Sequence, residues 1–392
     1  MPELNRLTAH LDPPFAVLDL DAFDRNADSL VRRAGGTPIR VASKSVRVRW
    51  LLSRVLGRPG FAGVMAFSLA EALWLIETGT VPVEQDVLVA YPSLDRGAFT
   101  ALAADPEARR RIVVMADDRA HLDLAEAAMR APGRLGEEPL RVCIDVDASY
   151  RIGRIHLGAR RSPLRTPADV APLLQRLVAS PELSAAGLMF YDAQIAGVAD
   201  TSPVVRAMQH RSARELVTRR ACVVAAARDI AGEGLLVNAG GTGSLHILAG
   251  DASVTELAAG SGLLAPHLFD SYRGFTPEPA AFFVAPVVRR PSARIVTVLG
   301  GGLVASGAAG RSRLPLPWWP EGMHFIGTEG AGEVQTPLVT APGDALNVGD
   351  RVWFRHAKAG ELCERFDVLH LVSGGELVTT TPTYRGEGRC FG

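Results

Sequence analysis

A regular alternation of short apolar runs and helical patterns fills the first 260 residues and limits the fold more than any other feature. Helical spacing occurs at 69–78, 119–130, 168–179 and 204–230. Between these patterns lie eight runs of strand length, at 39–43, 63–67, 86–90, 112–115, 140–145, 185–190, 235–239 and 257–259. Apolar strands that alternate with helices form a parallel sheet covered on both faces, and eight of them can close a barrel. We therefore predict an α/β fold containing a (β/α)8 TIM barrel, with an open doubly wound sheet as the alternative.

The pattern changes at about residue 282, where short β-patterns separated by Gly and Pro replace the helices. Their ranges are 284–288, 293–298, 324–326, 351–354, 367–371 and 376–380. Such runs predict a C-terminal antiparallel β-domain. A lone strand pattern at 15–20 precedes the first helix, and we expect it to pair with this domain. The predicted organisation is a barrel at 21–270 and a discontinuous β-domain made of 1–20 plus 271–392.

Composition narrows the kinds of partner that the chain can have. Lys and Arg number 42 and Asp and Glu number 42, so net charge does not favour nucleic acid or an anionic membrane. Cys143, Cys222, Cys363 and Cys390 are far apart and form no CxxC pair, a usage typical of a reducing compartment. No signal-peptide pattern opens the chain. We expect a cytoplasmic protein that acts on a small molecule, with no membrane span.

The lysine at the end of the first predicted barrel strand is the first candidate for chemistry. The run from Pro38 to Ser45 is the first strong β-pattern after the N-terminal helix, and Lys44 lies near its end. A side chain at this end of a barrel strand lies at the barrel mouth, where burial and neighbouring groups can make an amine nucleophilic. The alternative is an ordinary surface lysine at the end of a strand.

A glycine-rich loop supplies a second candidate about two hundred residues later. The strand pattern at 235–239 leads directly into Gly240, Gly241, Thr242, Gly243 and Ser244. Glycines allow consecutive backbone N–H groups to face one anion, and the hydroxyls add donors without bulk. A tight turn without function is the alternative. Because this loop and Lys44 both follow strands of one barrel, together they indicate a phosphorylated cofactor bound at the amine.

This ordered set of motifs resembles the fold-type III pyridoxal-phosphate enzymes, a superfamily that includes alanine racemase. Within it, the chain is most similar to the D-threonine aldolase and D-serine dehydratase group, also called the amino acid deaminase/aldolase family. The resemblance extends from Phe15 to about Thr380. It implies that pyridoxal 5'-phosphate forms a Schiff base with Lys44, that the substrate is an amino acid, and that the protein is a homodimer.

The resemblance also implies roles for further residues. Arg151, which is followed two positions later by glycine, corresponds to an arginine that faces the cofactor; a surface arginine is the alternative. Tyr191 corresponds to an aromatic residue beside the cofactor ring, with an ordinary strand-end tyrosine as the alternative, and Gln194 stands where the family has a histidine. The phosphate cup would consist of Gly241, Thr242, Gly243, Ser244, Gly260 and Ser261.

The sequence departs from the family near its C-terminus. In the aldolases and dehydratases, a histidine and, two residues later, a cysteine or aspartate hold a divalent metal that polarises the substrate's β-hydroxyl. Here His356 keeps the first position, but Lys358 occupies the second, and an ammonium repels a dication. The sequence therefore leaves open whether a metal binds near His356. A cluster of His356, Lys358 and Glu361 could instead act directly as acid and base on the hydroxyl; a charged turn between strands is the alternative.

The combined prediction is a pyridoxal-phosphate-dependent lyase that acts on a β-hydroxy D-amino acid by retro-aldol cleavage or deamination. Lys44 is its Schiff-base lysine, and His356 lies near the hydroxyl. One alternative is an amino acid racemase of the same fold. A non-catalytic pyridoxal-phosphate-binding protein is another, although those resemble the barrel alone. A phosphate-binding barrel enzyme without this cofactor would leave Lys44 with no role.

Overall fold

The computed structural model describes residues 1–130, 138–343 and 346–392. Within these ranges, eight parallel strands close into a barrel in the order β10-β11-β2-β3-β4-β5-β6-β9. Their bounds are β2 Ile39–Ala42, β3 Phe61–Ala66, β4 Val87–Val89, β5 Ile112–Ala116, β6 Leu140–Asp145, β9 Leu183–Phe190, β10 Leu236–Ala239 and β11 Glu256–Ala259. The predicted TIM barrel is therefore confirmed.

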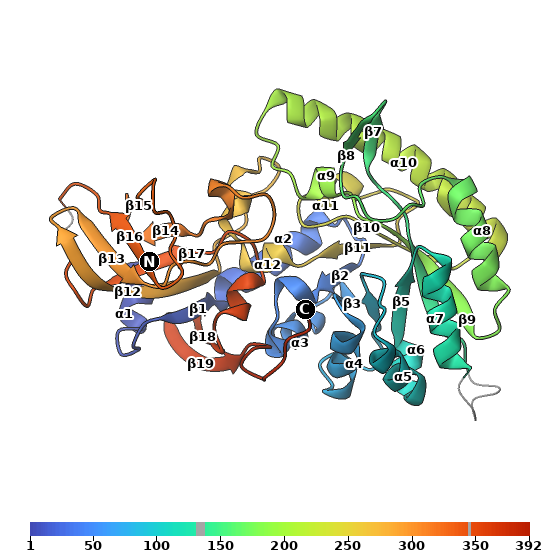
Figure 1. The fold of residues 1–392 in the computed structure, drawn as a ribbon, viewed down its shortest axis with the longest axis horizontal. Coiled ribbons are helices and arrows are strands. Elements are labelled where there is room, and N and C mark those ends of the chain that lie inside the picture. Colours follow the sequence, from blue (N-terminus) through green and yellow to red (C-terminus); the bar gives the residue numbers. More distant parts are fainter. Residues whose placement is uncertain (131–137, 344–345) are drawn as a thin grey trace.

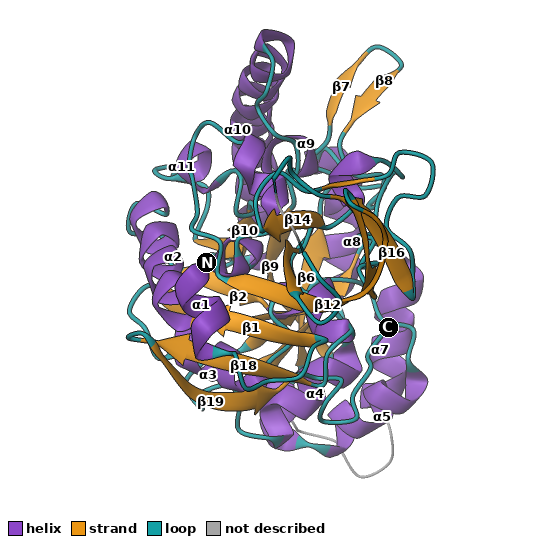
Figure 2. Cartoon of the chain, turned by 90° about the vertical axis from the view of Figure 1, so that its left-hand side faces the viewer, coloured by secondary structure: helices purple, strands orange, loops and turns teal. Residues whose placement is uncertain are grey.

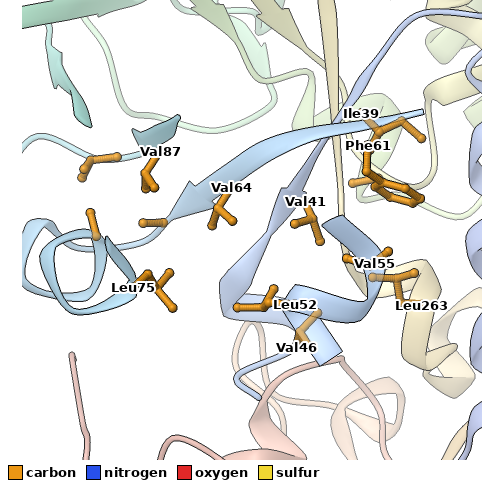
Figure 3. Close-up of a cluster of buried hydrophobic side chains, with 14 of the residues drawn as sticks. Ile39, Val41, Val46, Leu52, Val55, Phe61, Val64, Leu75, Val87 and Leu263 are labelled. Carbon is orange, nitrogen blue, oxygen red and sulfur yellow. The ribbon is translucent and has the colours of Figure 1, made fainter. Parts of the chain in front are cut away.

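Helices cover the outside of the barrel (Figure 1). They are α2 Leu20–Arg33, α3 Arg49–Leu56, α4 Leu69–Glu77, α5 Arg96–Ala104, α6 Pro106–Arg111, α7 Arg119–Met129, α8 Pro167–Val178 and α10 Pro203–Ala231. The short helices α9 Ala193–Ala196, α11 Leu245–Leu248 and α12 Ser261–Leu264 follow β9, β10 and β11, and α1 Pro2–Leu7 precedes β1. Figure 3 shows apolar side chains of β2, β3 and β4 packed against those of α3 and α4. This packing explains why the outward face of the barrel strands is apolar.

A hairpin between β6 and α8 was not predicted from the sequence, and neither were two strands of the second sheet, at Leu316–Trp319 and Gln335–Val339. Its strands are β7 Tyr150–Ile152 and β8 Ile155–Leu157, and Figure 2 shows it projecting from the body of the molecule. Ile152 and Ile155 are exposed on it. The hairpin lacks a buried face, so the alternation that reveals the barrel strands is absent from its sequence.

The second sheet has nine strands in the described residues and lies beside the barrel (Figure 1). It consists of β1 Phe15–Asp19, β12 Ala281–Ser292, β13 Ile295–Leu299, β14 Leu316–Trp319, β15 His324–Phe325, β16 Gln335–Val339, β17 Arg351–Arg355, β18 Val368–Ser373 and β19 Glu376–Pro382. Its pairings are antiparallel except that of β1 with β18. The N-terminal strand therefore pairs with this sheet, as expected. The domain limits 21–270 and 1–20 plus 271–392 remain a prediction.

A buried cluster of charges lies inside the barrel. Arg40 donates to Glu256 through Nε–Oε1 at 2.6 Å and Nη2–Oε2 at 2.8 Å. Its Nη1 lies 2.7 Å from Asp86 Oδ1, and Asn238 donates to Glu256 Oε1 at 2.7 Å. Because Arg40 and Glu256 are both almost fully buried, each charge depends on its partner for stabilisation.

No helix in the described ranges is both long enough and apolar enough to cross a membrane.

Removing the charge of Glu256 should destabilise the barrel because the Arg40 guanidinium would remain buried with less compensation. We expect Glu256→Gln to lower the free energy of unfolding by about 3 kcal/mol in urea denaturation. The matched control is Glu278→Gln, which weakens the exposed pair between Arg25 and Glu278 and should cost less than about 1 kcal/mol. Equal losses in the two variants would contradict this interpretation.

Candidate active site

A cavity of about 460 Å³ opens at the carboxyl ends of the barrel strands. Strand ends contribute Ala42, Met65, Met189 and Asn238 to its wall, and loops of the β-domain contribute Ser306, Arg313, Lys358 and Glu361. Both domains therefore form the cavity. In (β/α)8 barrels this end is where catalytic groups gather.

Lys44 lies in this cavity, on a turn directly after its barrel strand. The strand β2 ends at Ala42, and a 3-10 turn at Ser43–Ser45 carries the lysine, so Lys44 follows the strand instead of ending it. Its Nζ donates to the hydroxyl of Tyr91 at 2.7 Å. Arg47 has a left-handed backbone with φ of 52°, and its Nε donates to the Lys44 carbonyl at 3.1 Å. The turn therefore holds the backbone of Lys44 in place.

Two tyrosines and an arginine form the aromatic wall of the cavity. The Arg161 guanidinium lies 5.2 Å from the ring centroid of Tyr91 and 5.0 Å from that of Tyr191. Burial raises the pKa of Tyr91, but Lys44 and Arg161 together outweigh it, so the pKa falls below its usual value. Burial raises the pKa of Tyr191. A tyrosinate beside Lys44 is thus favoured more than at an isolated phenol.

Tyr191, which the sequence assigned to a place beside the cofactor ring, lies on this wall, whereas the sequence did not point to Tyr91 or Arg161. Tyr91 comes two residues after β4, just as Lys44 comes two residues after β2, so a systematic survey of strand ends would have found it. Arg161 lies in the loop after the β7–β8 hairpin, where spacing carries no signal.

The glycine-rich loop forms a cup whose walls leave no room for side chains. A Cβ atom at Gly241 would lie 2.8 Å from the Cβ of Ala196, and one at Gly243 would lie 2.3 Å from the carbonyl oxygen of Ala196. At Gly260, a Cβ would lie 2.6 Å from the carbonyl oxygen of Ala42. Gly241, Thr242, Gly260 and Ser261 line the cavity, and Ser261 Oγ donates to Thr242 Oγ1 at 3.1 Å. This small, polar cup suits an anion such as phosphate.

Three further residues assigned to the cofactor lie behind the cavity wall. Gly243 is used for close packing of the loop. Ser244 is buried, with its Oγ 3.1 Å from Asp192 Oδ1, and it accepts from Gly241 N at 3.1 Å. Gln194 is also buried and donates to Ala148 O at 2.8 Å and Ser212 Oγ at 2.9 Å. These residues support the loop and the wall without lining the cavity.

Arg151 is not brought to the cavity. It lies on β7 of the projecting hairpin, where its Nη2 is 2.5 Å from Asp147 Oδ2 and 44% of its side chain is exposed. The arginine that faces the cavity is Arg161, from the same strand-to-helix connection. The motif predicted that an arginine between β6 and α8 faces the cofactor, but it pointed to Arg151, whereas Arg161 lines the cavity.

His356 is also outside the cavity wall. It directly follows β17, and only 2% of its surface is exposed. Burial lowers the pKa of His356 to about 3, and the adjacent Arg355 lowers it too. The sequence placed this histidine near the substrate hydroxyl, but in the structure it is buried and does not line the cavity.

Lys358 and Glu361 are the charged groups that the same loop presents to the cavity. Lys358 Nζ donates to Ser306 O at 3.1 Å and to Ser306 Oγ at 3.0 Å. Glu361 Oε1 accepts from Ser306 N at 3.0 Å. Gly360 lies between them with φ of +93°, and a Cβ on it would lie 1.9 Å from the Lys44 carbonyl oxygen. Only glycine fits where this loop presses on the Lys44 turn.

The side chains of the cavity do not form a divalent metal site. The part of the chain that the structure describes has no group of three or more His, Cys, Asp or Glu residues able to hold an ion. His356 is buried and absent from the lining, Cys363 is buried with its pKa raised to about 12, and Lys358 brings an ammonium to the position of the second ligand. A dication would be repelled there instead of bound.

Comparisons with known proteins agree with the observed fold. A family model described as "Alanine racemase, N-terminal domain" matches residues 18–256. The solved structure of D-threonine aldolase from Filomicrobium marinum is 24% identical and has a TM-score of 0.80, covering 96% of this chain and 95% of that chain. D-threo-3-hydroxyaspartate dehydratase from Delftia sp. HT23 is 21% identical, with a TM-score of 0.68 and coverage of 95% and 97%.

Alanine racemase from Bacillus anthracis, solved with bound L-Ala-P, is 14% identical, with a TM-score of 0.62 and coverage of 96% and 99%. The comparison with curated proteins found no match. At these identities the structural matches establish a shared fold.

The neutral state of buried His356 predicts a pH dependence of stability. Its folded pKa of about 3 lies below the unfolded value near 6.5, so the unfolded chain binds the extra proton and stability falls as pH drops from about 6.5 toward 3. Between pH 7 and pH 5, wild type should lose about 2 kcal/mol more than His356→Leu in urea unfolding. If both proteins lose the same amount, His356 is not held neutral by burial.

Proposed function

Because the chain belongs to the alanine racemase N-terminal domain family, we propose that it is a pyridoxal 5'-phosphate-dependent lyase acting on a β-hydroxy D-amino acid. One observation carries this proposal: Lys44 and the glycine cup, which belong to different strand ends, line the same cavity. When bound, pyridoxal phosphate weakens the bonds to the substrate's Cα by accepting their electrons.

The residues present fit this cofactor. Gly241, Thr242, Gly260 and Ser261 would hold the phosphate, since their walls exclude Cβ atoms and their hydroxyls face the same space. Lys44 would attach to the aldehyde carbon, and Tyr191 would lie beside the ring, with Arg161 available to its polar edge. In this proposal Gln194, Gly243 and Ser244 support the cup from behind, and Arg151 has no contact with the cofactor.

The substrate class rests on two lines of support. The D-threonine aldolase and the D-threo-3-hydroxyaspartate dehydratase share this fold over nearly the whole chain, and their names describe β-hydroxy D-amino acids as substrates. In addition, the polar groups of Ser306, Lys358 and Glu361 face the cavity and can bind a hydroxyl. A racemase needs acid and base groups only at Cα, so these three polar groups would have no role in racemisation.

Attachment of the cofactor to Lys44 is the first test. We expect purified protein incubated with pyridoxal phosphate to show the visible absorbance of the bound cofactor, and borohydride to fix it on the peptide containing Lys44. Lys44→Ala should lose this modification, and its turnover should fall by about a thousandfold or more. Lys358→Met is the matched control, because it alters the other cavity lysine and should still be modified at Lys44. Modification of another residue would contradict the proposal.

Product analysis separates the possible reactions. With D-threonine as substrate we expect an aldehyde with glycine, or a 2-keto acid with ammonia, and little reaction with L-threonine. Formation of the other enantiomer alone would instead indicate a racemase. Bound cofactor with no turnover of any amino acid would support a non-catalytic carrier.

We also propose that the enzyme is a homodimer, as the family resemblance implies. Light scattering of the fully active protein tests this, and a fully active monomer would contradict it.

A further inference from the structure

The distribution of lysine in this chain points to a second functional amine. The 42 basic residues comprise forty arginines and only two lysines, Lys44 and Lys358. Both lysines line the same cavity, although they come from different domains. At every other basic position the chain uses arginine. The chemistry that separates lysine from arginine is therefore required in this cavity alone.

That chemistry is proton transfer. A guanidinium remains charged throughout the physiological range, whereas an amine can lose its proton when it is desolvated and placed near other cations. Fixed charge or hydrogen bonding to a carboxylate could be supplied by arginine, as at forty other positions. Lys44 has an amine-specific role in the proposed function, and Lys358 lacks one so far.

The surroundings of Lys358 suit a neutral amine that accepts a proton. Nζ donates two hydrogen bonds, to Ser306 O and Ser306 Oγ. A neutral amine has two N–H groups, so its lone pair would remain available for a third group in the cavity. Burial lowers the pKa of Lys358, the positive charges of Arg313 and Lys44 lower it further, and Glu361 and Tyr91 act in the opposite direction.

The backbone fixes Lys358 relative to Lys44. The Gly360 Cα lies so close to the Lys44 carbonyl that no side chain fits between the two segments. Lys358 is two residues before this contact, so its position follows from the contact of one backbone with the other. A substrate held through Lys44 would therefore meet the amine of Lys358 in a reproducible geometry.

We propose that Lys358 is a catalytic base that takes the proton of the substrate's β-hydroxyl, and that the reaction needs no divalent metal. The inference rests on the proposed function. As the O–H bond breaks, its proton passes to Lys358 Nζ and the C=O bond forms. The Cα–Cβ bond breaks with its electron pair left on Cα, which takes a proton from Lys44. The products are an aldehyde and glycine, after which Lys358 returns its proton to solvent and Lys44 regains one.

This assignment explains the departure from the family at the metal corner. A metal activates a hydroxyl by withdrawing electrons from its oxygen, which eases loss of the proton. An amine beside the oxygen removes the same proton directly. Because His356 is buried and does not line the cavity, and Lys358 brings an amine to the position of the second metal ligand, only the second route has its groups in place.

The decisive variant is Lys358→Arg, which keeps the positive charge but cannot accept a proton. We expect Lys358→Arg and Lys358→Met both to lower kcat for D-threonine cleavage by about 100-fold to 10,000-fold, while borohydride still fixes the cofactor on Lys44. Exposed Arg311 lies outside the cavity wall, so Arg311→Met is the control for loss of a nearby positive charge and should retain wild-type turnover. Wild type should retain activity and contain no bound divalent metal after chelation and metal analysis.

A readout independent of turnover uses the rarity of lysine. Protein carrying lysine labelled with ¹³C at Cε should give two resonances, and Lys358→Arg assigns one of them. That resonance should titrate below the ordinary lysine pKa of about 10.4. Titration at or above this value would overturn the proposal.

Other outcomes also decide the matter. An active wild type whose Lys358→Arg variant is equally active, or whose activity is lost on chelation and restored by a divalent metal, would overturn the role of Lys358 and leave the proposed function intact. Formation of a keto acid and ammonia instead of an aldehyde and glycine would overturn the role as base. A wild type that does not take up the cofactor at Lys44 would overturn both proposals together.

Discussion

The contact between Gly360 and the carbonyl of Lys44 is the constraint on which the cavity depends. It joins a loop of the β-domain to the turn of the barrel that carries Lys44, with no side chain in between. The loop reaches this position through a left-handed backbone that glycine adopts at little cost. Gly260 makes a similar close approach to Ala42, the residue that precedes the same turn. Two glycines therefore contact this part of the chain. The distances between the residues around it are set by contacts between backbones, which adjust less than contacts between side chains do.

The charges inside the barrel are balanced, whereas the lining of the cavity has an excess of positive charge. Beneath it, the buried Arg40 is balanced by Glu256 and Asp86, so the barrel interior carries no uncompensated cation there. Among the described residues that line the cavity, the cations Lys44, Arg47, Arg161, Arg313 and Lys358 outnumber the carboxylate of Glu361. Such an excess suits a ligand with several negative charges, as a phosphorylated cofactor bearing an amino acid would have. The cations that attract this ligand also lower the pKa of Tyr91 and Lys358.

The sequence predicted the architecture because burial leaves a periodic signal. The barrel strands, the long helix α10 and the strands of the β-domain other than β14 and β16 appear close to their predicted ranges. Lys44, Tyr191 and the glycine cup were also located, since each follows a strand that periodicity reveals. Arg161 could not be selected, because one of several arginines in a long connection faces the cavity for reasons of tertiary packing. Gln194 and Ser244 were near the right place, but their hydrogen bonds turn them behind the wall.

The loop around His356 shows why a match to a family motif does not establish that a side chain has the family's role. The alignment of motifs placed the histidine and Lys358 on the correct loop, yet the side chain that reaches the cavity is the lysine and not the histidine. The spacing of a motif predicts the position of the backbone. Which side chains face the cavity depends on the packing of the β-domain. Composition held a more direct signal. In a chain that uses arginine for nearly every positive charge, a lysine marks a position where a guanidinium is not equivalent. Both such positions lie in one cavity, and this observation supports the amine chemistry proposed for Lys44 and Lys358 independently of any family resemblance.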